Sequence, residues 1–283
     1  MPAKAITIMW ETDIKAPYPH FPLPPNRAAT PTKRQGTQRD PPHTTMPGTG
    51  PITSEPMSEI PSTDEALANL SMPLLDAMMT QRAVRRVKPD PVDDAIVVKC
   101  IELALRAPTG SNGQNWEFIV VKDQRVKDQL AKRYRQPWSI YGALGRRQSA
   151  GDETMLKILK AVEWQIEHFS EIPVLVIPCL RGGTRVPYVP TPFVGETSYF
   201  GSIYPSVQNL LLAARAMGLG ASLITMPLWS VTSARKILGL PLSVTPICVV
   251  PLGWPKGRYG PTTRKPVEDV VHLDSYGKRW LKA

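Results

Sequence analysis

Two stretches of this sequence carry the polar groups that could hold a ligand. The stretch "QRAVRRVKPDPV" (Gln81–Val92) is rich in arginine, whereas "TGSNGQ" (109–114) has no charge, histidine or cysteine and consists of small and amide-bearing residues. Guanidinium groups make charge-assisted hydrogen bonds to phosphate. Hydroxyl and amide groups donate to and accept from neutral polar atoms. The two stretches therefore predict a ligand with a phosphate and a flat, uncharged polar part.

Other site chemistries lack the residues they need. No GK[ST] follows the glycines of 109–114, and neither G-x-G-x-x-G nor G-x-S-x-G occurs. No HExxH or other spaced cluster predicts a metal site. The four histidines are interpreted as surface residues: His20, His43, His168 and His272. This set disfavours a hydrolase and favours a protein whose cofactor brings its own chemistry.

The charge of the chain agrees with an anionic ligand. Residues 1–70 hold six basic and seven acidic side chains, so the remainder holds 34 − 6 = 28 basic and 24 − 7 = 17 acidic ones, a net of +11. Such a surplus favours a phosphate, a nucleotide or nucleic acid. A soluble basic surface without a ligand would give the same count. Nucleic acid is the weaker partner, because blocks of aromatic residues interleaved with Lys and Arg are absent.

The cysteines and the hydropathy indicate the cellular location of the protein. Cys100, Cys179 and Cys248 are odd in number, show no CxxC spacing and have apolar neighbours, so we expect small buried hydrophobes. The longest apolar run, Ile172–Leu180, is too short to span a bilayer, and the N-terminus shows no signal-peptide pattern. We expect no metal, no membrane partner and a cytoplasmic location.

The chain divides by composition. Thirteen of the 31 prolines fall in residues 1–61, which show no helical or alternating period, so we expect a disordered arm there. Residues 62–265 are long enough for one domain with a sizeable core. Residues 266–283 form a C-terminal extension.

Helices must alternate with a few strands to position the two polar stretches. The run Val174–Leu180 is continuously apolar and predicts a central strand. Residues 181–203 predict a long Gly/Pro/Tyr-rich loop, either a lid or an interface. Further strands are expected at 116–121 and 245–254, and helices at 73–81, 90–106, 126–135, 154–169, 205–217 and 233–238. This pattern predicts an α+β or α/β sandwich.

Four segments in this order resemble the FMN-dependent nitroreductase family. They are Gln81–Val92, Ala107–Trp116, Tyr204–Thr225 and Pro251–Gly277. The long N-terminal extension and the tail look most like the mycobacterial NfnB-type nitroreductases. The resemblance implies an α+β three-layer sandwich with a central mixed sheet flanked by helices. It also implies a homodimer with FMN at the interface, in which residues 266–283 wrap the partner subunit.

The resemblance assigns the arginine-rich stretch to FMN. It implies that Arg82 approaches the phosphate, with Ala83 beside it, and that Arg85 approaches the ribityl chain or the N1–C2=O edge. Arg264 matches a phosphate-binding arginine of the family. Gln81 and Ala83 stand where the family often has arginine and serine, so this chain offers fewer phosphate ligands. Without the resemblance, a solvated basic turn is the alternative.

The same resemblance gives the uncharged loop a ligand. It implies that the loop wraps the ribityl hydroxyls and the isoalloxazine edge, while Gly110 and Gly113 let the backbone approach closely. Asn115 replaces a common proline. From the residues alone, an ordinary helix-to-strand turn stays open. The loop residues implied are Pro108, Thr109, Ser111, Asn112 and Gln114.

The segment "SLIT" (222–225) is expected at the reactive ring. The resemblance implies that the Thr225 backbone N–H points at flavin N5 and that Ile224 lines the ring. Trp138, Tyr141 and residues 181–203 are candidates for a lid, and core packing is the alternative for Trp138. The implied activity is NAD(P)H oxidation coupled to reduction of nitroaromatic or quinone-like acceptors, small aromatic molecules, by ping-pong hydride transfer. A flavin-consuming or dehalogenating enzyme, and a non-catalytic flavin sensor or store, stay open.

Overall fold

A computed structural model of the chain describes residues 59–182 and 192–280, with side chains in the second range from residue 197 onward. The predicted disordered arm, residues 1–61, therefore lies almost entirely outside the described residues. The elements below belong to the unit formed by residues 51–283.

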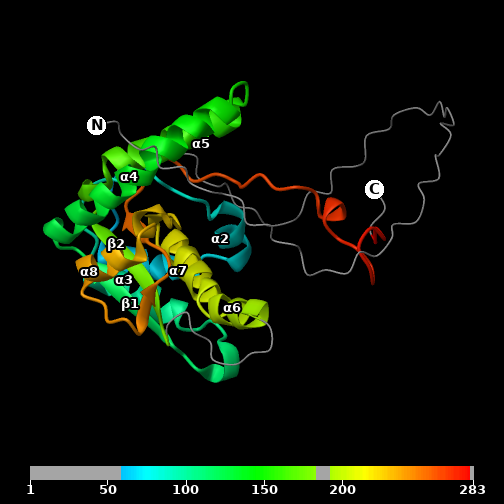
Figure 1. The fold of residues 1–283 in the computed structure, drawn as a ribbon, viewed down its shortest axis with the longest axis horizontal. Helices are drawn as coiled ribbons and strands as arrows, with labels where there is room; N and C mark the ends of the chain where they lie inside the picture. Colours follow the sequence, from blue (N-terminus) through cyan, green and yellow to red (C-terminus); the bar gives the residue numbers. More distant parts are fainter. Residues whose placement is uncertain (1–58, 183–191, 281–283) are drawn as a thin grey trace, which may run out of the picture. The chain divides into compact units, whose positions relative to one another are not determined.

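An antiparallel sheet organises the fold (Figure 1). Its strands lie in the order β1 (Trp116–Val121), β2 (Val174–Arg181), β5 (Val250–Gly253) and β3 (Gly220–Ala221), and β4 (Val244–Pro246) also pairs with β2. All strand pairings among the described residues are antiparallel, so the expectation of a mixed sheet is wrong for this chain. The helical hairpin between β1 and β2 explains the direction, because two antiparallel helices return the chain to the end of the sheet that it left.

Strand β2 is the central strand, as its apolar run predicts. Its side chains alternate between two buried clusters on opposite faces of the sheet, which is the two-residue period of a strand. Val174, Val176 and Leu180 contact one cluster, and Leu175, Ile177 and Cys179 contact the other. Both faces of β2 are therefore covered, which explains why it shows no polar alternation.

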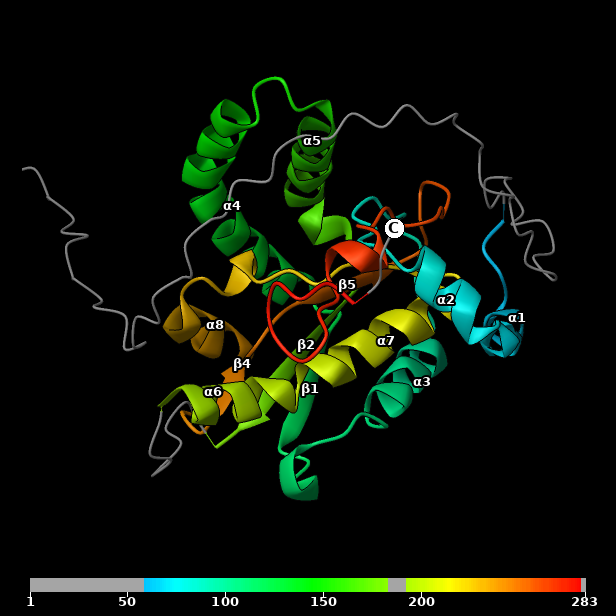
Figure 2. The ribbon, with the colours of Figure 1, turned by 90° about the vertical axis from the view of Figure 1, so that its right-hand side faces the viewer.

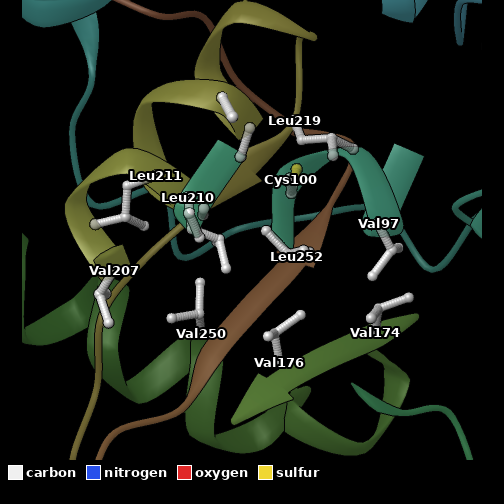
Figure 3. Close-up of a cluster of buried hydrophobic side chains, with 14 of the residues drawn as sticks. Val97, Cys100, Val174, Val176, Val207, Leu210, Leu211, Leu219, Val250 and Leu252 are labelled. Carbon is white, nitrogen blue, oxygen red and sulfur yellow. The ribbon is translucent and has the colours of Figure 1, made fainter. Parts of the chain in front are cut away.

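One face of the sheet is covered by α3 (Asp94–Ala104) and α7 (Tyr204–Ala216), and Figure 3 shows their side chains meeting those of β2 and β5. The predicted apolar face of α7 is confirmed as buried, from Val207 to Ala214. Helix α3 begins later than predicted, because the Asp93 carboxylate caps it by accepting from the Ala95 N–H at 2.8 Å. Helices α1 (Thr63–Ala68) and α2 (Leu74–Thr80), with η1 (Asn69–Ser71) between them, precede α3.

The other face is covered by α4 (Gln124–Gln148), α5 (Glu153–Glu167) and α8 (Val231–Leu238). The expected helical layers on both faces are thus confirmed. Helix α4 is far longer than the predicted 126–135, because it continues through the buried Pro137. After α5 the turn η3 (Phe169–Glu171) places Phe169 edge-on against Tyr134, with ring centroids 5.3 Å apart.

Two further expectations need correction. Part of the predicted 181–203 loop is α6 (Pro192–Gly201), while residues 183–191 lie outside the described residues. The predicted strand 245–254 is two strands. Ile247 still donates its N–H to the Pro178 carbonyl of β2 at 2.9 Å, but Cys248 and Val249 are not paired with β2, and Val249 instead forms a bridge with Ile224. The predicted burial of Cys100, Cys179 and Cys248 is confirmed, and burial raises the pKa of each thiol to about 12.

The C-terminal extension makes its own local contacts. It contains η5 (Val267–Asp269) and a bridge between His272 and Arg279. Several of its apolar side chains are exposed, including Val270 and Trp280. Across 59–182 and 192–280, none of the helices has the length and apolar character needed to cross a membrane. The same ranges contain no group of three or more His, Cys, Asp or Glu residues that could hold a metal.

Candidate functional site

The arginine-rich stretch is fixed to the edge of the sheet by backbone hydrogen bonds. The Val84 N–H donates to the Ala221 carbonyl in β3 at 2.9 Å. The Lys256 N–H donates to the Arg86 carbonyl at 3.0 Å, and Val87 forms a bridge with Pro255. Residues 82–86 and 256–258 therefore form one wall, although about 170 residues separate them in sequence.

Two glycines make room for this wall. A Cβ placed on Gly220 would lie 2.6 Å from Cγ1 of Val84, and one placed on Gly253 would lie 3.0 Å from Cβ of Val87. Real Cβ atoms essentially never approach as closely as 2.6 Å, and 3.0 Å is tighter than most contacts they make, so the two glycines let residues 84–87 pack directly on β3 and β5.

This wall borders a cavity of about 600 Å³, which we call the cation cavity. Helix α5 supplies the remaining lining. Seven lining residues carry a positive charge and none carries a carboxylate, which is an arrangement suited to a polyanion. The charged residues are Arg82, Arg85, Arg86, Lys157, Lys160, Lys256 and Arg258.

Arg85 is the most constrained of these cations. Its Nε is buried and has no hydrogen-bond partner among the described residues. Burial lowers the pKa of the Arg85 guanidinium, with a smaller opposing effect from Tyr134 and a further lowering by the Arg82 cation. A buried charged donor without an acceptor is costly, so this side chain is suited to an anionic or carbonyl oxygen of a ligand.

A buried polar chain lies behind Arg85. Tyr134 Oη donates to Oε1 of Gln165 at 3.4 Å, and Nε2 of Gln165 donates to Oγ of Ser222 at 3.1 Å. All three side chains are almost fully buried. Burial raises the pKa of Tyr134 to about 12, so its phenol stays neutral beside the arginine.

The uncharged loop is held in a strained conformation. Ser111, Asn112 and Gln114 have φ values of 52°, 52° and 45°, a region that side chains other than glycine rarely occupy. The neighbouring Gly110 and Gly113 do not have positive φ, so the left-handed backbone falls on residues that carry side chains. Strain of this kind clusters at ligand sites, and it points to a loop shaped for binding.

The strained loop is fastened by few bonds. Gln114 Nε2 donates to Oδ1 of Asn112 at 3.1 Å, and the Gly110 N–H donates to Oγ of Ser202 at 3.2 Å. The loop borders a second cavity, of about 330 Å³, which includes Thr109, Ser111 and Gln114 in its lining. Pro108 and Asn112 do not line it, but both are exposed on the same loop.

The segment expected at the flavin ring borders a third, mainly apolar cavity of about 410 Å³. Thr225 lines it together with Tyr141 and Trp229. The Thr225 N–H donates to no other group within the described part of the chain, whereas Ile224 is buried and exchanges two backbone hydrogen bonds with Val249. The lid candidate Trp138 packs against the core cluster between the sheet and helices α4, α5 and α8.

The expected cofactor residues fall into two groups in one chain. Arg82, Ala83 and Arg85 lie near Ile224 and Thr225, because Val84 bonds to Ala221 and Thr225 is at most about 14 Å of chain further on. The uncharged loop precedes β1, at the opposite edge of the sheet (Figure 2). Three strand spacings separate β1 from β3, which is about 14 Å across the sheet. The loop also lies at the far end of β1, about 17 Å further along the strand direction.

Arg264 stands apart from both groups. It is exposed, lines none of the three cavities, and donates from Nη1 to its neighbour Thr263 at 2.7 Å. The preceding backbone does pass the arginine wall, since a Cβ on Gly260 would lie 3.8 Å from Nη1 of Arg82.

Several lining residues of the cation cavity were not predicted. Lys157, Lys160 and Trp164 share one face of α5 at i, i+3 and i+7, and Lys256 and Arg258 belong to "PKGR" (255–258). The helical spacing could have identified a common face. The sequence alone does not indicate that this face lies opposite residues 82–86.

Comparisons with known proteins identify related chains. Residues 78–254 match the model of the Nitroreductase family. An NADH dehydrogenase of Thermus thermophilus is 28% identical over 213 residues, which cover 71% of this chain and 97% of that protein. An iodotyrosine deiodinase of Daphnia pulex is 28% identical over 204 residues, covering 69% of this chain and 63% of the relative.

A solved structure shows the same fold. The crystal structure of oxidized iodotyrosine deiodinase bound to FMN and 3-iodo-L-tyrosine matches 72% of this chain and all of that chain, with a TM-score of 0.57 and 22% identity. These relatives support the resemblance at the level of the family. The closer resemblance to NfnB-type enzymes stays a prediction.

Proposed function

The chain belongs to the nitroreductase family, and from that premise we propose that it is an FMN-dependent NAD(P)H oxidoreductase that reduces nitroaromatic or quinone-like acceptors. The observation that carries the proposal is Arg85, which lines a cavity together with six other cations and whose buried Nε has no partner among the described residues. Bound FMN would supply the redox chemistry, by passing hydride through N5 from NAD(P)H to the acceptor.

The residues present fit FMN in separate ways. Arg82 and the other cations of the wall suit its phosphate, and the Arg85 guanidinium suits a ribityl oxygen or a ring carbonyl. The free N–H of Thr225 suits a ring nitrogen and offers no competing nucleophile. The apolar lining around Thr225 would exclude water from a flat aromatic acceptor.

We further propose that the uncharged loop reaches the flavin of a second copy. One chain holds the loop at the far corner of the sheet from Arg85, whereas a twofold axis can bring the loop of one copy to the arginine wall of the other. Exposed apolar side chains on α2 and on the C-terminal extension would be covered in such a homodimer: Leu74, Leu75, Met78, Met79, Val267, Val270 and Trp280.

Mixing two defective variants tests this arrangement. Arg85→Met damages one half of the site, and Asn112→Ala with Gln114→Ala damages the other. In a homodimer with shared sites, each mixed dimer has one intact site, so co-refolding the inactive variants should restore about one quarter of the wild-type activity. No recovery, with mixed dimers demonstrated by mass spectrometry, would place both halves of the site in one chain.

The activity is tested by spectroscopy and turnover. Purified protein should show flavin absorbance, which bleaches on addition of NADPH or NADH under nitrogen and returns when a nitroaromatic or a quinone is added. Protein that takes up no added FMN would end the cofactor proposal. Protein that binds FMN and is not reduced by either nucleotide would be a flavin sensor or store.

Reductive dehalogenation is the second candidate, because relatives include an iodotyrosine deiodinase. The linings of the three cavities contain no Asp or Glu among the described residues, so the ammonium group of an amino-acid substrate would lack a counter-ion from this chain. We therefore expect nitroaromatic and quinone turnover to exceed iodide release from 3-iodo-L-tyrosine. The reverse order would favour the dehalogenase.

A further inference from the structure

The cation cavity holds more positive charge than one FMN phosphate requires. We propose that Lys157 and Lys160 of α5 select a hydride donor with a 2′-phosphate, so that NADPH binds in preference to NADH. This inference rests on the proposed function, in which FMN would occupy one side of the cavity.

The charge balance supports a second anionic group. A phosphate monoester carries about −1.5 to −2 charges near neutral pH, whereas the cavity lining carries seven cations and no carboxylate. The 2′-phosphate of NADPH is a further monoester, and NADH lacks it. The surplus cations match the ligand with more negative charge.

The cations lie on two walls with different properties. Arg82, Arg85 and Arg86 belong to the wall fixed by backbone hydrogen bonds to the sheet. Lys157 and Lys160 project from α5, and the Lys157 side chain is 80% exposed, with its only carboxylate neighbour among the described residues being Glu153 at 3.9 Å. The α5 lysines are therefore available to a ligand that enters after FMN has occupied the fixed wall.

Lys256 connects the two walls. It belongs to the fixed wall by its backbone, and its Nζ lies 4.8 Å from the centroid of the Trp164 ring on α5. This cation–π contact holds a further positive charge against α5, in the cavity lining that also includes Lys160. An anion between the walls would thus meet lysines from both sides.

The absence of carboxylates from this lining also argues against NADH. In Rossmann folds an Asp or Glu binds the ribose 2′-hydroxyl of NAD, whereas an Arg accommodates the 2′-phosphate of NADP, and the same charge preference holds for any site at the 2′ position. The described lining of the cation cavity provides only the second type of group. The selection is therefore assigned to charge at the 2′ position.

Binding of redox-inactive fragments tests this directly. FMN-loaded protein is titrated calorimetrically with adenosine 2′,5′-bisphosphate and with 5′-AMP, which differ by the 2′-phosphate. We expect the bisphosphate to bind at least about tenfold more tightly, with an advantage that shrinks as salt rises. The double variant Lys157→Ala/Lys160→Ala should lose this advantage, and Lys132→Ala, an exposed lysine on α4, should keep it.

The outcomes separate this inference from the proposed function. Flavin absorbance that persists in the double variant, together with a reduced NADPH-to-NADH ratio of kcat/KM, supports the inference. Equal affinity for both fragments in the wild type, or an unchanged ratio in the double variant that still binds FMN, overturns it and leaves the oxidoreductase intact. Wild-type protein that binds no FMN overturns both.

Discussion

The arginine wall and the uncharged loop are two halves of one proposed site, and they are built by different means. Residues 84–88 are bonded to β3 and to residues 254–256, and Val84 and Val87 pack closely on Gly220 and Gly253. Residues 109–115 are largely exposed and keep three residues at positive φ, and they are bonded to the rest of the chain through Ser202 and through the Arg181 N–H, which donates to the Asn115 carbonyl at 2.7 Å. Charge and burial suit the wall to ligand binding, whereas a strained backbone conformation suits the loop to it.

This difference predicts how each half responds to mutation. A wall fixed by long-range contacts should lose ligand affinity when a cation is removed. It should lose stability when a larger residue replaces a glycine on which it packs. A strained loop should become more stable when the strain is relieved, at the expense of binding. Variants of the two halves should therefore separate the stability of the fold from affinity for FMN.

Arg85→Met should have the largest effect. Removal of a buried charge-assisted hydrogen bond to FMN, worth about 1.5–3 kcal/mol, should weaken FMN binding roughly ten- to 150-fold. The melting temperature of the FMN-free protein should not fall, because its Nε has no partner within the described chain. Flavin fluorescence titration gives the affinity, and Arg135→Met, at an exposed site on α4, is the control. Equal affinity in both variants would remove Arg85 from the site.

Gly220→Ala should damage the wall through the fold. The new methyl would lie 2.6 Å from Val84, so residues 84–87 must move or the strands must separate, at a cost of about 1–3 kcal/mol. Urea unfolding should show this loss, and FMN affinity should fall with it. Gly201→Ala meets no atom within 4 Å and should leave both unchanged. A stable Gly220→Ala variant with normal FMN binding would show that the wall does not pack directly on Gly220.

Ser111→Gly should act in the opposite direction on stability. Relief of a positive φ offsets the flexibility that glycine adds to the unfolded chain, so the free energy of unfolding should rise by up to about 1 kcal/mol. FMN affinity should fall, because the hydroxyl and the fixed loop shape are lost. Lower stability in this variant would mean that the loop is not strained.

Arg264→Ala should have the smallest effect and sharpens the comparison between buried and exposed cations. This side chain is exposed and lines none of the three cavities, so its loss should weaken FMN binding only about two- to fivefold without unfolding the chain. A loss as large as that of Arg85→Met would place the phosphate beside Arg264 instead.

Local patterns in the sequence predicted elements whose cause is local. Strand β1, the apolar run of β2 and the buried face of α7 follow from side-chain periodicity over a few residues. Helix α4 was predicted too short because a proline normally ends a helix, yet here Pro137 is buried within it. The strand break at 248–249 depends on Ile224, a distant partner that no local pattern shows.

The site residues also divide into those that local sequence patterns indicate and those that depend on the fold. Arg82, Arg85 and the loop could be found from residue types, because cations and amides at close spacing indicate a polar ligand. The lysines of α5 could not be assigned, since their role depends on how the helical hairpin folds back over residues 82–86. Residues 266–283 were expected to wrap a partner, which a single chain does not test.

The long insertion between β1 and β2 has a consequence for how the chain folds. These strands pair along their whole length, from Trp116 with Leu180 to Val121 with Leu175, although residues 122–173 lie between them. Such pairing must close a large loop before any ladder forms, whereas α4 and α5 can form from neighbouring residues. Refolding should therefore show early helix formation in circular dichroism and a slower phase in which the sheet assembles.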